Sequence, residues 1–120
     1  FVENYDYLSD TIKIIKCINP NCSFFVTVSP VPLARTFSDE DVFVANLYSK
    51  STLRSVAGQI SEDLDDVYYF PAYEIVSALG SGAFREDLRH VRTEVVNKII
   101  QGFCNAYIAP DGKQPSYQYN

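Results

Sequence analysis

The chain has 120 residues, which suits one compact domain or a large piece of one. Because 47% of the residues are hydrophobic, enough apolar surface is available to offset the loss of chain entropy, and an intrinsically disordered chain is excluded. The formal net charge of −5 is spread along the sequence without a Lys/Arg stripe, so we expect neither nucleic acid nor an anionic membrane as a partner.

The sequence contains no recognisable targeting signal and no cluster of residues with metal-ligand spacing. No apolar run approaches the roughly 20 residues that cross a bilayer, and the N-terminus lacks the charged-then-apolar order of a signal peptide. We therefore expect a soluble, cytoplasmic chain. Three cysteines without a CxxC motif and a single histidine give no zinc spacing, so no metal and no cofactor are expected. Cys17 and Cys22 flank a turn that could bring them together, but two unpaired, buried thiols are favoured over a disulfide.

The first predicted elements are a helix and a short strand. Between residues 5 and 18, apolar side chains recur at steps of three and four, as on a helix with one buried face. Residues 23–28 are almost continuously apolar, β-branched or aromatic, which is typical of a strand covered on both faces. Pro30 and Pro32 then end this strand in a rigid loop.

A long helix and a second strand complete a βαβ unit. The Ser-Asp-Glu-Asp sequence at 38–41 supplies an N-cap and an acidic first turn for a helix near residues 39–60. Residues 67–70 form the second short strand. The two strands should be parallel neighbours with the helix on one face, which defines the fold class as α/β. Two such strands alone would leave exposed edges, so we expect further strands upstream.

The last predicted element is an amphipathic helix at residues 93–107, with Thr93 as its N-cap, and it should pack back on the sheet. Residues 110–120 have the composition of a polar tail or linker.

The main candidate for chemistry is the Asp87-Leu88-Arg89-His90 segment. A carboxylate three residues before an imidazole can accept the ring N–H and hold the ring in one tautomer. The segment follows a Gly-Ser-Gly loop and precedes the final helix, on the side of the strands' C-terminal ends where open α/β sheets place their sites. The spacing is common by chance, however, and a solvated histidine beside an acidic cap is the simpler interpretation of these four residues alone.

Four segments in the same order resemble successive blocks of the GSCFA family, over roughly residues 5–108. They are FVTVSPVPL at 25–33 with RTF at 35–37, ANLYSKSTLR at 45–54, YFPAYEIV at 69–76, and Asp87-x-x-His90. The resemblance implies the SGNH (GDSL-like) hydrolase group and a flavodoxin-like three-layer α/β/α sandwich with a parallel sheet, of which residues 1–109 would be the C-terminal part. In that group a C-terminal Asp-x-x-His supplies two members of a Ser-His-Asp triad, which implies that Asp87 and His90 are catalytic.

The resemblance further implies a serine-dependent ester hydrolase or O-acyltransferase whose substrate is a small-molecule or carbohydrate ester. The Gly-Ser-Cys-Phe-Ala segment that names the family is not in these 120 residues, so we expect the nucleophile elsewhere and no activity from this chain alone. Ser29 precedes a proline, Ser81 lies outside any strand-to-helix elbow, and neither replaces it convincingly. The alternative is a non-catalytic α/β domain that binds a partner or a carbohydrate.

Several other residues have a structural and a functional interpretation. Arg35 and Arg54 could bind a substrate carboxylate or sugar, but pairing with nearby acids is favoured. The aromatic side chains at 68–70 and at 73 could stack on a sugar ring, but packing in the core is favoured. Glu74 is expected to be a cap or an ion-pair partner.

Overall fold

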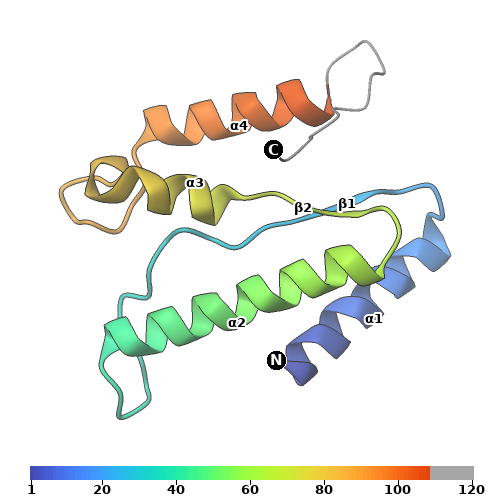
Figure 1. The fold of residues 1–120 in the computed structure, drawn as a ribbon, viewed down its shortest axis with the longest axis horizontal. Coiled ribbons are helices and arrows are strands. Elements are labelled where there is room, and N and C mark those ends of the chain that lie inside the picture. Colours follow the sequence, from blue (N-terminus) through green and yellow to red (C-terminus); the bar gives the residue numbers. More distant parts are fainter. Residues whose placement is uncertain (109–120) are drawn as a thin grey trace.

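The structure, a computed structural model, describes residues 1–108, so the polar tail predicted for residues 110–120 lies outside the described part. Within these residues five helices and two strands follow one another in the chain, and their arrangement is shown in Figure 1. They are α1 (Val2–Ile18), β1 (Phe24–Val26), α2 (Val42–Asp63), β2 (Val67–Tyr69), α3 (Ala72–Leu79), the 3₁₀ helix η1 (Gly80–Ala83) and α4 (Thr93–Tyr107).

The two strands are parallel neighbours joined by α2, which confirms the predicted βαβ unit. Phe24 lies opposite Val67, and Val26 lies opposite Tyr69. The ladder is extended by the N–H of Phe70, which donates to the carbonyl of Val26 over 2.8 Å. The protein is therefore a mixed α/β structure built around a small parallel sheet.

Helices cover one face of this sheet through a buried apolar cluster. Successive side chains of a strand point to opposite faces, so Phe24 and Val26 share one side. On that side they pack against Ile12 of α1 and Val56 and Ile60 of α2, which are 3% exposed or less. These contacts place α1 and α2 together on one side of the sheet, as Figure 1 shows.

The other face of the sheet carries aromatic rings that contact α4. Phe25 of β1 stacks on Tyr68 of β2, with 5.4 Å between ring centroids. Phe103 and Tyr107 of α4 meet Phe25 edge to face, at 5.0 and 4.5 Å. The last helix thus packs back on the sheet as predicted, and helices lie on both sides of the two strands (Figure 1).

Two helices are capped by residues other than those expected from the sequence. Helix α2 begins at Val42 and not near residue 39, because the carboxylate of Asp41 accepts the N–H of Phe43 over 2.8 Å and so caps the helix there. Helix α4 has the predicted bounds, but its cap residue is Arg92, and no side chain caps it. The hydroxyl of Thr93, the expected cap, lies 3.3 Å from the guanidinium of Arg85 instead.

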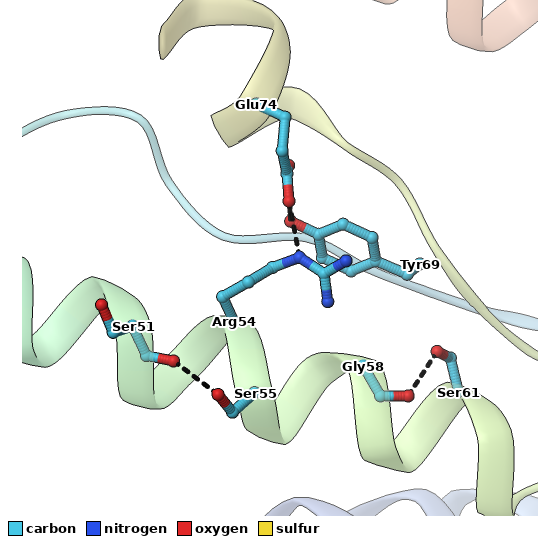
Figure 2. Close-up of polar contacts among 7 residues, drawn as sticks. All are labelled: Ser51, Arg54, Ser55, Gly58, Ser61, Tyr69 and Glu74. Atoms are coloured by element: carbon cyan, nitrogen blue, oxygen red, sulfur yellow. Dashed lines mark hydrogen bonds and ion pairs between the residues drawn. The ribbon is translucent and has the colours of Figure 1, made fainter.

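Helix α3 was not anticipated, and a three-residue cluster ties it to the sheet and to α2 (Figure 2). Nε of Arg54 lies 2.5 Å from Oε1 of Glu74, which confirms that Arg54 pairs with an acid and Glu74 with a cation. The hydroxyl of Tyr69 donates to Oε2 of Glu74 over 2.8 Å, and the guanidinium carbon of Arg54 lies 3.9 Å above the Tyr69 ring. We call Arg54, Tyr69 and Glu74 the polar cluster.

Cys17 is exposed and Cys22 is half-buried, and both are free thiols. The two cysteines are therefore unpaired as expected, but neither is fully buried. Within residues 1–108 no helix has both the length and the apolar character needed to cross a membrane.

Candidate active site

The candidate site lies at the tip of a loop that joins η1 to α4. Phe84 and Val91 form an antiparallel bridge across the base of this loop. Above the bridge, the N–H of Arg85 donates to the carbonyl of His90 over 2.8 Å. Below it, the N–H of Arg92 donates to the carbonyl of Ala83, also over 2.8 Å. The loop is thus closed by its own main chain, and it presents Asp87-Leu88-Arg89-His90 at its tip.

The tip is shaped by a left-handed residue and by one carboxylate oxygen. Leu88 has a φ of 53°, a conformation that costs a residue with a Cβ roughly 1–2 kcal/mol. Oδ1 of Asp87 accepts the main-chain N–H groups of Arg89 and His90, each over 3.0 Å. These two hydrogen bonds hold the turn in place and so offset the strain at Leu88. Backbone strain of this kind is common at functional sites.

The second oxygen of the same carboxylate contacts the histidine ring. Oδ2 of Asp87 lies 2.5 Å from Nδ1 of His90, which is the contact expected from the spacing of the two residues. Both side chains reach solvent, since 47% of the Asp87 side chain and 56% of the His90 side chain are exposed. With an ionised carboxylate as acceptor, Nδ1 carries the hydrogen of a neutral ring, and Nε2 is left as the basic nitrogen.

The electrostatics of the pair favour the ionised carboxylate. The hydrogen bond from the His90 ring, followed by the main-chain N–H groups of His90 and Arg89, lowers the pKa of Asp87 far below its ordinary value. Hydrogen bonds to the charged form of an acid stabilise that form. Asp87 is therefore an anion at neutral pH and can both orient His90 and stabilise a positive charge on its ring.

The serines considered from the sequence do not meet this pair. Ser29 follows β1, where its hydroxyl lies 3.3 Å from the N–H of Val31 and its carbonyl accepts from Lys50 over 2.6 Å. Ser81 lies in η1 and is exposed. Among the described residues, no serine hydroxyl is within hydrogen-bond distance of His90.

Two depressions border the Asp87–His90 pair. The first, which we call the apolar depression, has a volume of about 410 Å³ and is lined by Pro30, Val31, Ala72, Val76, Arg85, His90, Val91, Val96 and Ile99. The second, the charged depression, has a volume of about 650 Å³ and is lined by Arg85, Glu86, Asp87, Arg92, Thr93 and Glu94. The sequence analysis did not predict the residues that line the two depressions. For Arg85, the sequence offers one hint of a role at the site, its position two residues before Asp87.

The fold and this loop define a mixed α/β protein that holds a carboxylate–imidazole pair after its second parallel strand. The chain belongs to the GSCFA family, whose match extends over residues 1–103 and includes both Asp87 and His90. No curated protein and no solved structure matches the chain. Residues 1–108 contain no group of three or more His, Cys, Asp or Glu side chains that could hold a metal ion.

Proposed function

We propose that this chain supplies the Asp-His part of a Ser-His-Asp triad in an SGNH-type ester hydrolase or O-acyltransferase. The observation that carries the proposal is the 2.5 Å contact between Oδ2 of Asp87 and Nδ1 of a solvent-accessible His90. Family membership supports it, because the Asp-x-x-His segment lies within the matched residues. The nucleophilic serine would come from outside these 120 residues.

In the proposed mechanism His90 is the general base and then the general acid. Nε2 of His90 takes the proton of the serine hydroxyl as the serine oxygen bonds to the ester carbonyl carbon, and Asp87 stabilises the imidazolium that forms. The imidazolium returns that proton to the departing alcohol, and an acyl-enzyme remains. Attack by water on the acyl-enzyme gives hydrolysis, and attack by a sugar hydroxyl gives acyl transfer.

The proposal extends to the architecture and the substrate. We take residues 1–109 as the C-terminal part of a flavodoxin-like three-layer sandwich, and the helices on both sides of the β1–β2 pair support this. Further parallel strands would continue the sheet, since two strands alone are marginal. Acylated carbohydrate is the substrate class that the SGNH relationship favours, and fold-level analogy is the only support for it.

The test is ester hydrolysis by the natural protein that carries this chain. We expect His90→Ala to abolish turnover of p-nitrophenyl acetate and labelling by a fluorophosphonate probe. Asp87→Asn should keep the fold but lower kcat by about 10⁴-fold, because it favours the wrong histidine tautomer. Arg89→Ala is the matched control, since Arg89 contributes only a main-chain N–H to the loop and should keep activity within a few-fold.

Thermal melts of all variants separate loss of activity from loss of fold. Full turnover by a folded His90→Ala protein would remove His90 from the mechanism. The 120-residue chain alone is expected to show neither turnover nor labelling, because a base without a placed nucleophile accelerates nothing.

A further inference from the structure

The apolar depression is lined by four parts of the fold, one of which is the candidate loop with Arg85, His90 and Val91. The loop after β1 provides Pro30 and Val31, helix α3 provides Ala72 and Val76, and helix α4 provides Val96 and Ile99. Val76 is completely buried, whereas Val96 is 38% exposed, so the depression has a fixed inner wall and an open rim. Its volume of about 410 Å³ lies in the range of roughly 300–1,000 Å³ that is typical of small-molecule sites.

Among the described residues that line this wall, Arg85 and His90 are the two with charged or titratable side chains, and both belong to the candidate loop. Arg85 lies close to Thr93, with 3.3 Å between Nη2 and the Thr93 hydroxyl oxygen. His90 is the candidate base, with Nδ1 held by Asp87. The rest of the wall is Pro, Val, Ala and Ile. The Pro, Val, Ala and Ile side chains bind hydrocarbon well and offer no hydrogen-bonding groups to sugar hydroxyls.

The charged depression borders the other member of the pair. Asp87 contributes to it together with two further acids and two arginines. The Asp87–His90 pair therefore lies between an apolar and a charged surface, and Arg85 lines both. An ester has the same two-sided character, because its carbonyl joins an acyl chain to an alcohol.

We infer that the apolar depression binds the acyl chain of the substrate, and that the charged depression receives its polar alcohol part. This inference rests on the proposed function, because the proposed mechanism is what places the ester carbonyl beside His90. It predicts a preference for acyl chains longer than acetyl, with hexanoyl as a suitable probe. Each methylene moved from water into the depression should raise kcat/KM by about fourfold.

The kinetic test compares p-nitrophenyl hexanoate with p-nitrophenyl acetate in the natural protein that carries this chain. The wild type should prefer hexanoate. Val96→Trp fills the rim of the depression and should lower the hexanoate-to-acetate ratio of kcat/KM at least about tenfold, an amount equal to roughly two buried methylenes. Ile100→Trp is the control, because Ile100 is exposed on the same helix and lines neither depression; its ratio should equal that of the wild type.

A binding measurement tests the depression without catalysis. In protein with ¹³C-labelled Val and Ile methyl groups, sodium hexanoate should shift the NMR signals of Val31, Val76, Val96 and Ile99, and sodium acetate should not. Val96→Trp should weaken the hexanoate-induced shifts, and Ile100→Trp should leave them intact.

The two measurements separate failure of the inference from failure of the proposed function. Ester turnover that depends on His90 but shows no chain-length preference and no hexanoate shifts would overturn the inference and leave the dyad in place. If another part of the protein fills the depression, the inference is likewise overturned and the Asp87–His90 pair keeps its proposed role. If a folded protein shows hexanoate-induced shifts but neither hydrolyses the two esters nor is labelled by the fluorophosphonate probe, the apolar binding site is supported and the proposed function is overturned.

Discussion

At the scale of single residues, Asp87 uses its two carboxylate oxygens for different purposes. Oδ1 accepts two main-chain N–H groups and fixes the turn, while Oδ2 contacts Nδ1 of His90. All three contacts favour the anion, which is why the pKa of Asp87 is lowered although the side chain reaches solvent. A carboxylate can therefore be held as an anion here without burial.

This arrangement predicts how Asp87 titrates. In an NMR titration of its carboxyl carbon, the pKa should lie well below the ordinary value, and His90→Ala should raise it, since the largest cause of the shift is the His90 ring. The pKa should stay somewhat low because the two main-chain hydrogen bonds remain. Arg89→Ala keeps its N–H and should leave the titration unchanged. An unchanged pKa in His90→Ala would contradict the assigned contact.

The sign of the effect on stability follows from the direction of this pKa shift. A lowered folded-state pKa means that the unfolded chain binds more protons at acidic pH. The contribution of Asp87 to the free energy of unfolding is therefore present above its ordinary pKa. It is lost as the pH falls through the lowered folded-state value.

Sequence reasoning reached the pair but not its surroundings, for a physical reason. Asp87 and His90 are three residues apart, so local geometry alone brings them together. Val31, Val76 and Val96 line one depression only after the sheet and two helices have packed. No local sequence pattern predicts that they lie together.

At the scale of the elements, the polar cluster joins α2, β2 and α3. Burial and the hydrogen bond to Glu74 raise the pKa of Tyr69, so its hydroxyl keeps its proton and remains a donor. Burial by itself raises the pKa of Glu74, but hydrogen bonds from Tyr69, from the main-chain N–H of Glu74 and from Arg54 outweigh it, and the net pKa is lowered. Glu74 is thus the shared acceptor that anchors the start of α3.

Glu74→Gln tests this anchor. The substitution removes the charge that both partners contact, and we expect it to lower the free energy of unfolding by about 1–2 kcal/mol, less than for a fully buried pair because 41% of the Glu74 side chain is exposed. Urea denaturation measures the loss. Because the folded-state pKa of Glu74 is lowered, the difference from wild type should be full at neutral pH and shrink as the pH falls through that value.

Glu62→Gln on α2 is the matched control, because Glu62 is exposed and has no ion pair among the described residues. It should change the stability by less than about 0.5 kcal/mol. Equal losses from the two variants would mean that the polar cluster contributes nothing specific.

The elements that the sequence predicted well have strong local signals. The bounds of α4 agree with the prediction because its apolar stripe has the helical period throughout. Helix α3 was missed because it has only eight residues and starts directly after Pro71, a residue that marked the end of a strand. The sequence predicts too early a start for α2, because several residues at 38–41 can cap a helix. In the structure the capping residue is Asp41.

At the scale of the whole molecule, aromatic rings hold the α4 layer on the sheet. Phe103 lies 5.0 Å from Phe25, 5.1 Å from Phe70 and 5.2 Å from Tyr107, measured between ring centroids. No residue of α4 is fully buried, so these ring contacts and the apolar stripe account for its position. Helix α4 also carries one wall of the apolar depression, which makes its packing relevant to the site.

Phe103→Ala should loosen this layer. We expect the free energy of unfolding to fall by about 2–3 kcal/mol, near the lower end for removal of a large core side chain because Phe103 is only partly buried. Thermal or urea unfolding measures the change. Ile100→Ala, which removes an exposed side chain from the same helix, should cost less than about 1 kcal/mol. A larger loss from Ile100→Ala than from Phe103→Ala would place the main contacts of α4 elsewhere.

The hydrogen bonds that shape the loop around Asp87 and His90 join residues within 81–93, including the pairing at the Phe84–Val91 bridge and the contacts of the two oxygens of Asp87. A segment that supplies its own hydrogen bonds can be transferred between proteins when its apolar packing is reproduced. Its thirteen residues can be exchanged as a cassette between family members, or grafted between a 3₁₀ turn and a helix of a designed scaffold, with the carboxylate–imidazole pair already assembled.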